Sequence, residues 1–199
     1  MKVKRVLALS PHTDDAEIGA GGTIAKLIEQ GSEVTCFAFW GPGYLEKEFA
    51  ESMKILGVDD FEIFDFVKRR YYSQRQEILQ LLYDYDVDHD LDLIFTPATT
   101  DVHQDHQVIT NEALRAFKAS SILGYEIPRN NIAFTKTCFS PLNQQHVEKK
   151  IQSLMCYSSQ REQRSNRFNE ELFRADLIAK GPFVGSKFAE AFEVIKVIM

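Results

Sequence analysis

Residues 11–22 read PHTDDAEIGAGG and follow directly on the apolar run VLALS. An apolar run of this length, bounded by turn residues, is typical of a buried parallel strand. The glycine-rich part continues as EIGAGGTIAKLIEQG, residues 17–31, in which apolar side chains recur at helical spacing. Three side chains that carry chemistry, His12, Asp14 and Asp15, therefore stand in the turn between a predicted strand and a predicted helix.

Apolar runs of strand length alternate with segments of helical spacing along the first half of the chain. The expected strands are VKRVLALS, EVTCFAFW, FEIFDF and DLIFTPA, at residues 3–10, 33–40, 61–66 and 92–98. The expected helices between them lie at residues 17–31, 45–57 and 76–86. This alternation predicts an α/β fold, a three-layer sandwich in which helices cover both faces of a mostly parallel central sheet.

The second half of the chain alternates less regularly. Helices are expected at residues 106–120, 143–157 and 168–180, and short strands at residues 122–127, 134–139 and 188–198. No repeat, low-complexity tract or Pro/Gly-rich linker divides the 199 residues. We therefore expect a single domain over residues 1–199.

Composition and charge exclude several classes of partner. The formal net charge of -6, from 23 basic and 29 acidic residues, leaves no broad cationic surface for a nucleic acid. No apolar run is long enough for a signal peptide or a membrane span. The three cysteines are odd in number and far apart, which does not fit a disulfide framework. A cytoplasmic location is expected, and homo-oligomerisation is left open.

A second loop resembles the first in its chemistry. Residues 97–107, PATTDVHQDHQ, follow the fourth predicted strand and carry Asp101, His103, Asp105 and His106. In a doubly wound sheet the first and fourth strands commonly lie side by side, and ligands bind in the crevice between the loops that follow them. We therefore expect the two loops to bring imidazoles and carboxylates together at one rim of the sheet.

Imidazoles and carboxylates in this combination point to a zinc site. Catalytic zinc typically has three protein ligands and one open position for water. His12, Asp15 and His106 would supply the three ligands. Asp14 and His103 are then left for proton transfer.

Two other interpretations of these residues are available. One is that Asp14 or Asp15 merely caps the helix and that the histidines lie on the surface. The other is that GAGG is the glycine fingerprint of a dinucleotide site, but Ile24 stands where the third glycine belongs and the two carboxylates would repel a pyrophosphate. Two acid-and-histidine clusters after two adjacent strands favour the metal site over both.

The chain resembles the PIG-L family, also called LmbE-like de-N-acetylases. PHTDDAEIGAGGTIAKL resembles the PHPDDxExGxGGT opening of that family, with Thr13 in place of the usual proline, and DVHQDH resembles its second metal motif. CYSSQ at residues 156–160 and FAEAFEVIK at residues 188–196 are similar to the later blocks of the family. The resemblance thus touches nearly the whole chain.

The resemblance implies a Rossmann-like fold, one zinc ion per chain, and hydrolysis of an N-acetyl group from a glucosamine-type sugar. It also implies a role for each matching residue. His12, Asp15 and His106 match the zinc ligands, Asp14 the general base, His103 the residue that stabilises the oxyanion, and Asp105 its orienting partner. The products would be acetate and a free amine, in surface-glycan or thiol-cofactor biosynthesis.

The rest of the substrate is less constrained. Arg69 and Arg70, in FDFVKRRYYSQRQEIL, follow the third predicted strand, whose carboxyl end opens on the same rim as the metal loops. Such a patch is either a solvated helix end or a contact for a phosphate or nucleotide carried by the sugar. A zinc amidohydrolase acting on a non-sugar amide and a non-catalytic zinc-binding protein are the alternative functions.

Overall fold

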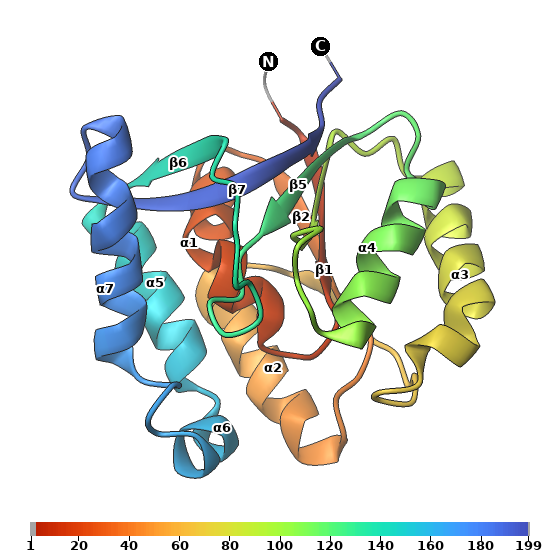
Figure 1. Ribbon diagram of the computed structural model, residues 1–199, viewed down its shortest axis with the longest axis horizontal. Coiled ribbons are helices and arrows are strands. Elements are labelled where there is room, and N and C mark those ends of the chain that lie inside the picture. Colours follow the sequence, from red (N-terminus) through yellow and green to blue (C-terminus); the bar gives the residue numbers. More distant parts are fainter. Residues whose placement is uncertain (1–2, 199) are drawn as a thin grey trace.

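One sheet takes strands from nearly the whole chain in the computed structural model, which describes residues 3–198 (Figure 1). The strand order is β3-β2-β1-β4-β5-β7-β6. The strands are β1 (Arg5–Ser10), β2 (Glu33–Ala38), β3 (Asp60–Ile63), β4 (Leu93–Pro97), β5 (Ser121–Tyr125), β6 (Cys138–Leu142) and β7 (Phe188–Lys196). β1 to β5 pair in parallel, and β7 pairs antiparallel with both β5 and β6. The predicted mostly parallel α/β sheet is confirmed.

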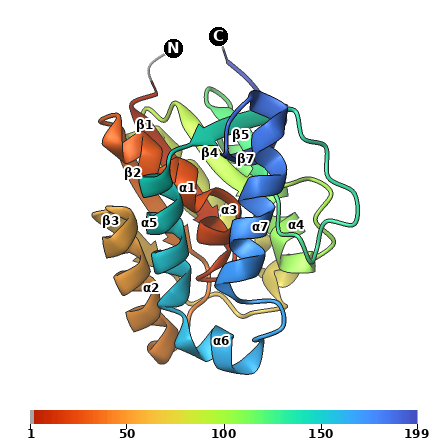
Figure 2. The ribbon, with the colours of Figure 1, turned by 90° about the vertical axis from the view of Figure 1, so that its left-hand side faces the viewer.

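Helices cover both faces of this sheet (Figure 1). On one face lie α1 (Asp15–Glu29), α2 (Gly43–Leu56), α5 (Gln144–Met155) and α7 (Glu170–Lys180), and on the other lie α3 (Arg75–Asp88) and α4 (Gln104–Ala116). Figure 2 shows α5 between α2 and α7. Three short helices were not expected: η1 (Tyr71–Gln74), α6 (Ser158–Gln163) and η2 (Gly181–Val184).

The core consists of two apolar clusters, one on each face of the sheet. Strand β1 contributes to both, because successive side chains of a strand point to opposite faces. Val6 and Ala8 belong to the cluster under α1, whereas Leu7 and Leu9 belong to the cluster under α3 and α4. Burial on both faces explains why this strand reads as a continuous apolar run.

The glycines of GAGG let α1 lie close against the sheet. A Cβ atom on Gly19 would lie 2.3 Å from Cδ2 of Tyr125 in β5, and one on Gly22 would lie 2.5 Å from Cδ1 of Leu142 in β6. Any larger residue would push the helix away, and with it the aspartates at its first turn.

Strands β1 and β4 are neighbours, as expected: Val6, Leu7 and Ala8 pair with Leu93, Ile94 and Phe95. Because the two strands are parallel, the loops that follow them leave from the same edge of the sheet.

In the described part of the chain, no helix is long and apolar enough to cross a membrane.

Candidate metal centre and pocket

A tight turn after β1 brings His12 and Asp15 together. The hydroxyl of Ser10 donates to the His12 carbonyl at 2.5 Å and accepts the Ala16 N–H at 3.0 Å. One carboxylate oxygen of Asp15, Oδ2, accepts the backbone N–H of His12 at 2.9 Å and lies 3.1 Å from its Nδ1. The turn thus aims the imidazole and the carboxylate at the same point.

Three buried tyrosines fix the path of this turn. Tyr125 donates to the Leu9 carbonyl at 2.7 Å and Tyr71 donates to the Pro11 carbonyl at 2.6 Å. The third, Tyr157, donates to the Thr13 carbonyl. All three rings are fully buried and come from β5, η1 and the segment before α6. The carbonyls of Leu9, Pro11 and Thr13 therefore each accept a hydrogen bond from a different part of the fold.

The loop after β4 places His106 in the first turn of α4. Its Nδ1 lies 2.7 Å from Oδ2 of Asp101, and the other carboxylate oxygen of Asp101 accepts the His103 N–H at 2.8 Å. Asp101 is fully buried. It thereby orients the ring that it faces, as carboxylates behind metal-binding histidines commonly do. Asp101 was expected in this loop, but no role was predicted for it.

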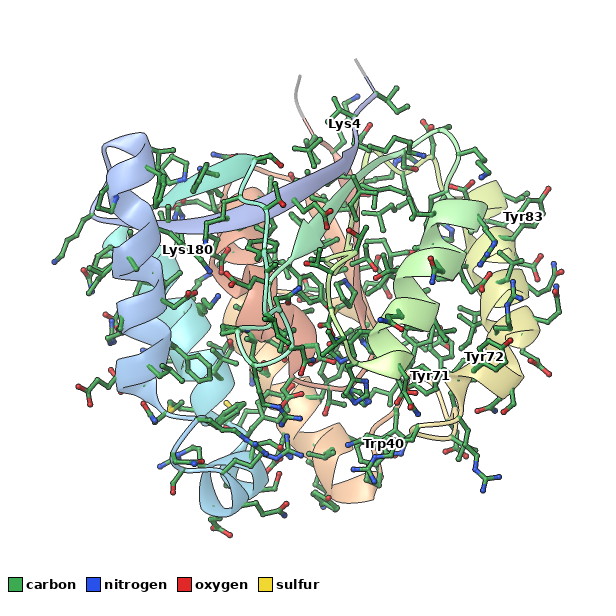
Figure 3. The ribbon with its side chains drawn as sticks, in the orientation of Figure 1. Lys4, Trp40, Tyr71, Tyr72, Tyr83 and Lys180 are labelled. Atoms are coloured by element: carbon green, nitrogen blue, oxygen red, sulfur yellow. The ribbon has the colours of Figure 1, made fainter. Side chains whose placement is uncertain are left out.

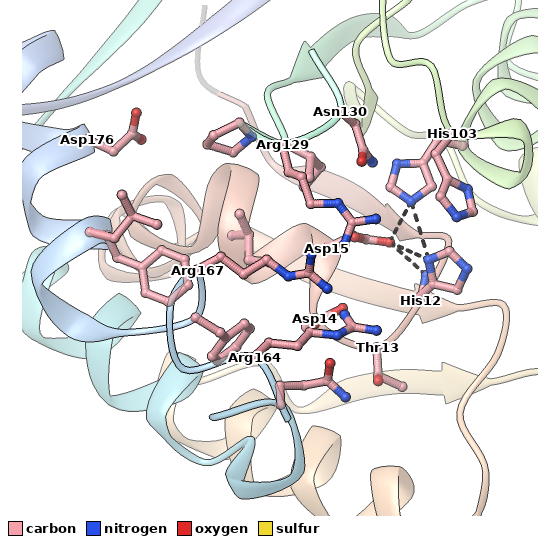
Figure 4. A pocket seen from close by; sticks show the side chains of 18 of the residues that line it. His12, Thr13, Asp14, Asp15, His103, Arg129, Asn130, Arg164, Arg167 and Asp176 are labelled. Atoms are coloured by element: carbon pink, nitrogen blue, oxygen red, sulfur yellow. Dashed lines mark hydrogen bonds and ion pairs between the residues drawn. The ribbon is translucent and has the colours of Figure 1, made fainter. Parts of the chain in front are cut away.

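The three predicted ligands meet in a compact triangle, of which Figure 4 labels His12 and Asp15. Asp15 Oδ2 lies 3.1 Å from His12 Nδ1 and 3.1 Å from His106 Nε2, and the two nitrogens are 3.3 Å apart. Neighbouring ligand atoms around a tetrahedral zinc ion, bound at about 2.0–2.1 Å, are separated by about 3.3 Å. The donor set and its spacing therefore fit a zinc-sized cation.

The hydrogen bonds behind the two rings support this fit. His106 Nδ1 faces Asp101, and His12 Nε2 lies 3.3 Å from Oδ2 of Asp105. When these outer nitrogens carry the hydrogens, the inner atoms turn lone pairs toward one another and toward Asp15, an arrangement that a cation between them would stabilise. Burial alone would lower the pKa of His106, but the charge of Asp15 and the bond to Asp101 outweigh it and raise the pKa to about 10. A proton is held strongly where a metal ion would bind.

His103 stands at the start of α4 beside this triangle. Its Nδ1 accepts the backbone N–H of Asp105 at 3.2 Å, so the hydrogen of a neutral ring is on Nε2. Burial and the charge of His106 lower the pKa of His103 to about 4. One nitrogen each of His12, His103 and His106 also lie within 4.8 Å of one another. This looser group is a second possible ligand set.

The carboxylates of Asp105 and Asp14 have different surroundings. Asp105 Oδ2 accepts the Arg69 N–H at 2.7 Å and faces His12, so it is the backbone of Asp105, not the carboxylate, that contacts His103. Asp14 is the N-cap residue of α1, yet its side chain makes no capping hydrogen bond. It lines the pocket instead, where burial and the charge of Asp15 raise its pKa.

A pocket of about 600 Å³ opens over the triangle, within the usual range for small-molecule sites. Trp40 and Tyr71 lie at the same end of the molecule in Figure 3, and the ammonium group of Lys68 is 4.0 Å from the centre of the Trp40 ring. Of the two arginines expected at this rim, Arg69 lines the pocket, whereas Arg70 is exposed and is not among the lining residues.

The far wall of the pocket was not predicted. It is formed by the loop after β5, by α6 and the turn after it, and by α7. Its apolar side chains come mainly from α7 and the turn before it, and its polar ones are Arg129, Asn130, Gln160, Arg164, Arg167 and Asp176. The family-like block CYSSQ ends at Gln160 and was the one sequence signal close to this wall.

Comparison with known proteins relates the chain to deacetylases. A family model described as "PIG-L: GlcNAc-PI de-N-acetylase" matches residues 7–117, which include both metal loops. The "Uncharacterized deacetylase YaiS" of Escherichia coli (strain K12) is 25% identical over 171 residues, covering 79% of this chain and 92% of that protein.

Two solved structures illustrate the shared fold. N,N'-diacetylchitobiose deacetylase from Pyrococcus horikoshii has a TM-score of 0.72 and 18% identity, covering 98% of this chain and 84% of that one. GalB, the 4-carboxy-2-hydroxymuconate hydratase from Pseudomonas putida KT2440, has a TM-score of 0.80 and 19% identity, covering 98% of both chains. The same fold thus occurs in a deacetylase and in a hydratase.

Proposed function

The chain belongs to the PIG-L family, and on that premise we propose that it is a zinc-dependent hydrolase that removes the N-acetyl group from an N-acetylglucosamine-type sugar or sugar conjugate. The products are acetate and a free amine. The observation that carries this proposal is the triangle of His12, Asp15 and His106 with Asp14 free of capping bonds beside it. Such a site combines a cation-binding group with an adjacent carboxylate able to move a proton.

In this proposal His12, Asp15 and His106 hold the zinc ion. When bound, zinc supplies Lewis acidity toward the acetamide carbonyl and makes water a better nucleophile at neutral pH. Asp101 and Asp105 hold the two imidazoles in the orientation that turns a lone pair inward.

Asp14 acts as the general base. Its raised pKa suits a group that takes a proton from the attacking water and returns it to the leaving amine. His103 donates a hydrogen bond from Nε2 to the oxyanion that develops on the carbonyl oxygen, while its Nδ1 accepts the Asp105 N–H. Both side chains line the pocket.

Acetate release from a panel of N-acetylated compounds tests the proposal. The zinc-loaded protein should release acetate from N-acetylated amino sugars, and a chelator or Asp14→Asn should abolish that release. Acetate from N-acetylated amines alone would favour an amidohydrolase of non-sugar substrates. No acetate from any compound, with zinc bound, would favour a non-catalytic zinc-binding protein or a different reaction, and would overturn the proposal.

A further inference from the structure

Three arginines gather on the pocket wall that faces the metal triangle. Arg129 lies in the loop after β5, Arg164 ends α6, and Arg167 lies in the turn before α7. All three line the pocket, and Figure 4 shows their guanidinium groups extending toward Asp14 and Asp15. Arg164 and Arg167 thus come from one stretch of the chain and Arg129 from a separate loop, and all three point into one space.

Within residues 3–198, no carboxylate forms an ion pair with this cluster, although Asp14, Asp15 and Asp176 line the same pocket. None of the ion pairs there includes Arg129, Arg164 or Arg167. Several arginines elsewhere do have carboxylate partners: Arg174 lies between Glu148 and Glu170, and both Arg75 and Arg115 contact Glu112. The cluster thus places in one pocket three guanidinium groups that have no ion-pair partner among the described residues.

The charges of the cluster act on one another and on the site. The pKa of Arg167 is lowered by the charge of Arg129 and, to a smaller extent, by that of Arg164. Figure 4 shows the guanidinium group of Arg164 extending toward Asp14, at the edge of the metal triangle. Like charges gathered in this way repel, and a bound anion relieves that repulsion.

We propose that the substrate is a phosphorylated N-acetyl sugar whose phosphate is bound by Arg129, Arg164 and Arg167. The guanidinium group donates two parallel hydrogen bonds to phosphate, and three such groups match its several oxygens. Because Arg164 extends toward Asp14 in the same pocket, the phosphate lies near the acetamide, on the sugar itself or on the first group attached to it. This inference rests on the proposed deacetylase function.

Direct binding tests the phosphate site without turnover. Inorganic phosphate and glucosamine 1-phosphate are titrated by calorimetry into the zinc-loaded protein and into the same protein after chelation. Arg164→Gln and Arg167→Gln should each weaken binding at least tenfold in both forms. Arg161→Gln, an exposed arginine of α6 outside the pocket lining, is the matched control and should change it less than twofold. Binding that disappears with the metal, or is equal in all variants, would overturn the inference.

Kinetics distinguish the phosphate source and separate this inference from the proposed function. kcat/KM is compared for N-acetylglucosamine, its 1-phosphate and its uridine diphosphate conjugate. Arg167→Gln should lower the ratio of phosphorylated to neutral kcat/KM at least tenfold, and the better of the two phosphorylated compounds identifies the source. Equal kcat/KM for neutral and phosphorylated sugars overturns the phosphate inference alone. Absence of acetate from every sugar overturns the deacetylase function, while the binding experiment still decides the phosphate site.

Discussion

Lys150 and Glu190 form a buried ion pair against the middle of α1, with Nζ 2.5 Å from Oε1. Lys150 also donates to the Ile18 carbonyl at 2.6 Å, and Glu190 accepts the N–H groups of Gly22 and Thr23 at 3.0 and 2.7 Å. In a regular α-helix the carbonyl of Ile18 accepts a hydrogen bond from the N–H of Gly22. Lys150 and Glu190 thus contact the acceptor and the donor of the same helical turn. The ion pair therefore ties α5 and β7 to the helix whose first turn carries Asp14 and Asp15.

Removing one partner of this pair should be strongly destabilising. Lys150→Met leaves the Glu190 carboxylate buried without a counter-charge, and we expect the free energy of unfolding to fall by about 3–5 kcal/mol in urea denaturation. The double variant Lys150→Met with Glu190→Gln removes both charges and should recover part of that loss. If the double variant is as unstable as the single one, the two charges are not coupled as the structure indicates.

A glycine in α1 is expected to be irreplaceable by alanine. The Cβ atom of Gly19→Ala would lie 2.3 to 2.6 Å from three atoms at the base of the Tyr125 side chain, which is itself held by its bond to Leu9. We expect a loss of about 2 kcal/mol or more in urea denaturation, as for other overpacked cores. Gly43→Ala, at the start of α2 with no atom within 4 Å, is the control. Equal losses in the two variants would contradict the close approach of α1 and β5.

Most strands could be predicted because a strand that is buried on both faces appears in the sequence as an apolar run. Most helices could be predicted because their apolar side chains recur at helical spacing. The exception is instructive. A strand was expected at residues 134–139, whereas β6 runs from Cys138 to Leu142 and includes Pro141. β6 is an edge strand that pairs only with β7, so a proline without a donor is tolerated there and the apolar signal is weak.

The metal loops could be predicted because all their chemistry lies in two short segments that follow neighbouring strands. The contacts that hold them could not. Tyr71, Tyr125 and Tyr157 reach the first loop across 60, 116 and 144 positions of sequence. Each looks like an ordinary core aromatic in its own segment, and only the tertiary fold shows which carbonyl it meets. The same holds for the arginines on the far wall.

The carboxylate behind His106 should influence metal affinity without binding the metal. Asp101→Ala removes the acceptor at 2.7 Å from Nδ1 and frees the ring to rotate, so we expect metal affinity to fall by about 10–100-fold. Competition with a chromogenic chelator measures this. Asp90→Ala, whose side chain is 94% exposed, should leave the affinity as in the wild type. An unchanged affinity in Asp101→Ala would show that the ring is held by other contacts.

The adjacent residues Asp14 and Asp15 are expected to have different functions, which their asparagine variants should reveal. Asp14→Asn keeps the triangle intact, so we expect it to retain the metal and to lose deacetylation by about a hundredfold or more, the scale of a general base. Asp15→Asn should instead weaken metal binding, because one of its oxygens faces both imidazoles. His12→Ala and His106→Ala should lose most of the metal as well. Elemental analysis decides, and equal metal loss in Asp14→Asn and Asp15→Asn would contradict this division.

Arg69 is the one non-glycine residue among residues 3–198 with a positive φ, at 66°, and its backbone N–H is fixed by Asp105 at 2.7 Å. The left-handed conformation costs an ordinary residue about 1–2 kcal/mol, and glycine adopts it freely at a smaller entropic cost. Arg69→Gly should therefore be more stable than Arg69→Ala by about 0.5–1 kcal/mol in thermal or urea unfolding. Both variants lack the guanidinium group, so if that group contacts the substrate, KM should rise to the same extent in both. A KM that rises in Arg69→Ala alone would show instead that the loop conformation, through Asp105 and His12, is what the substrate site requires.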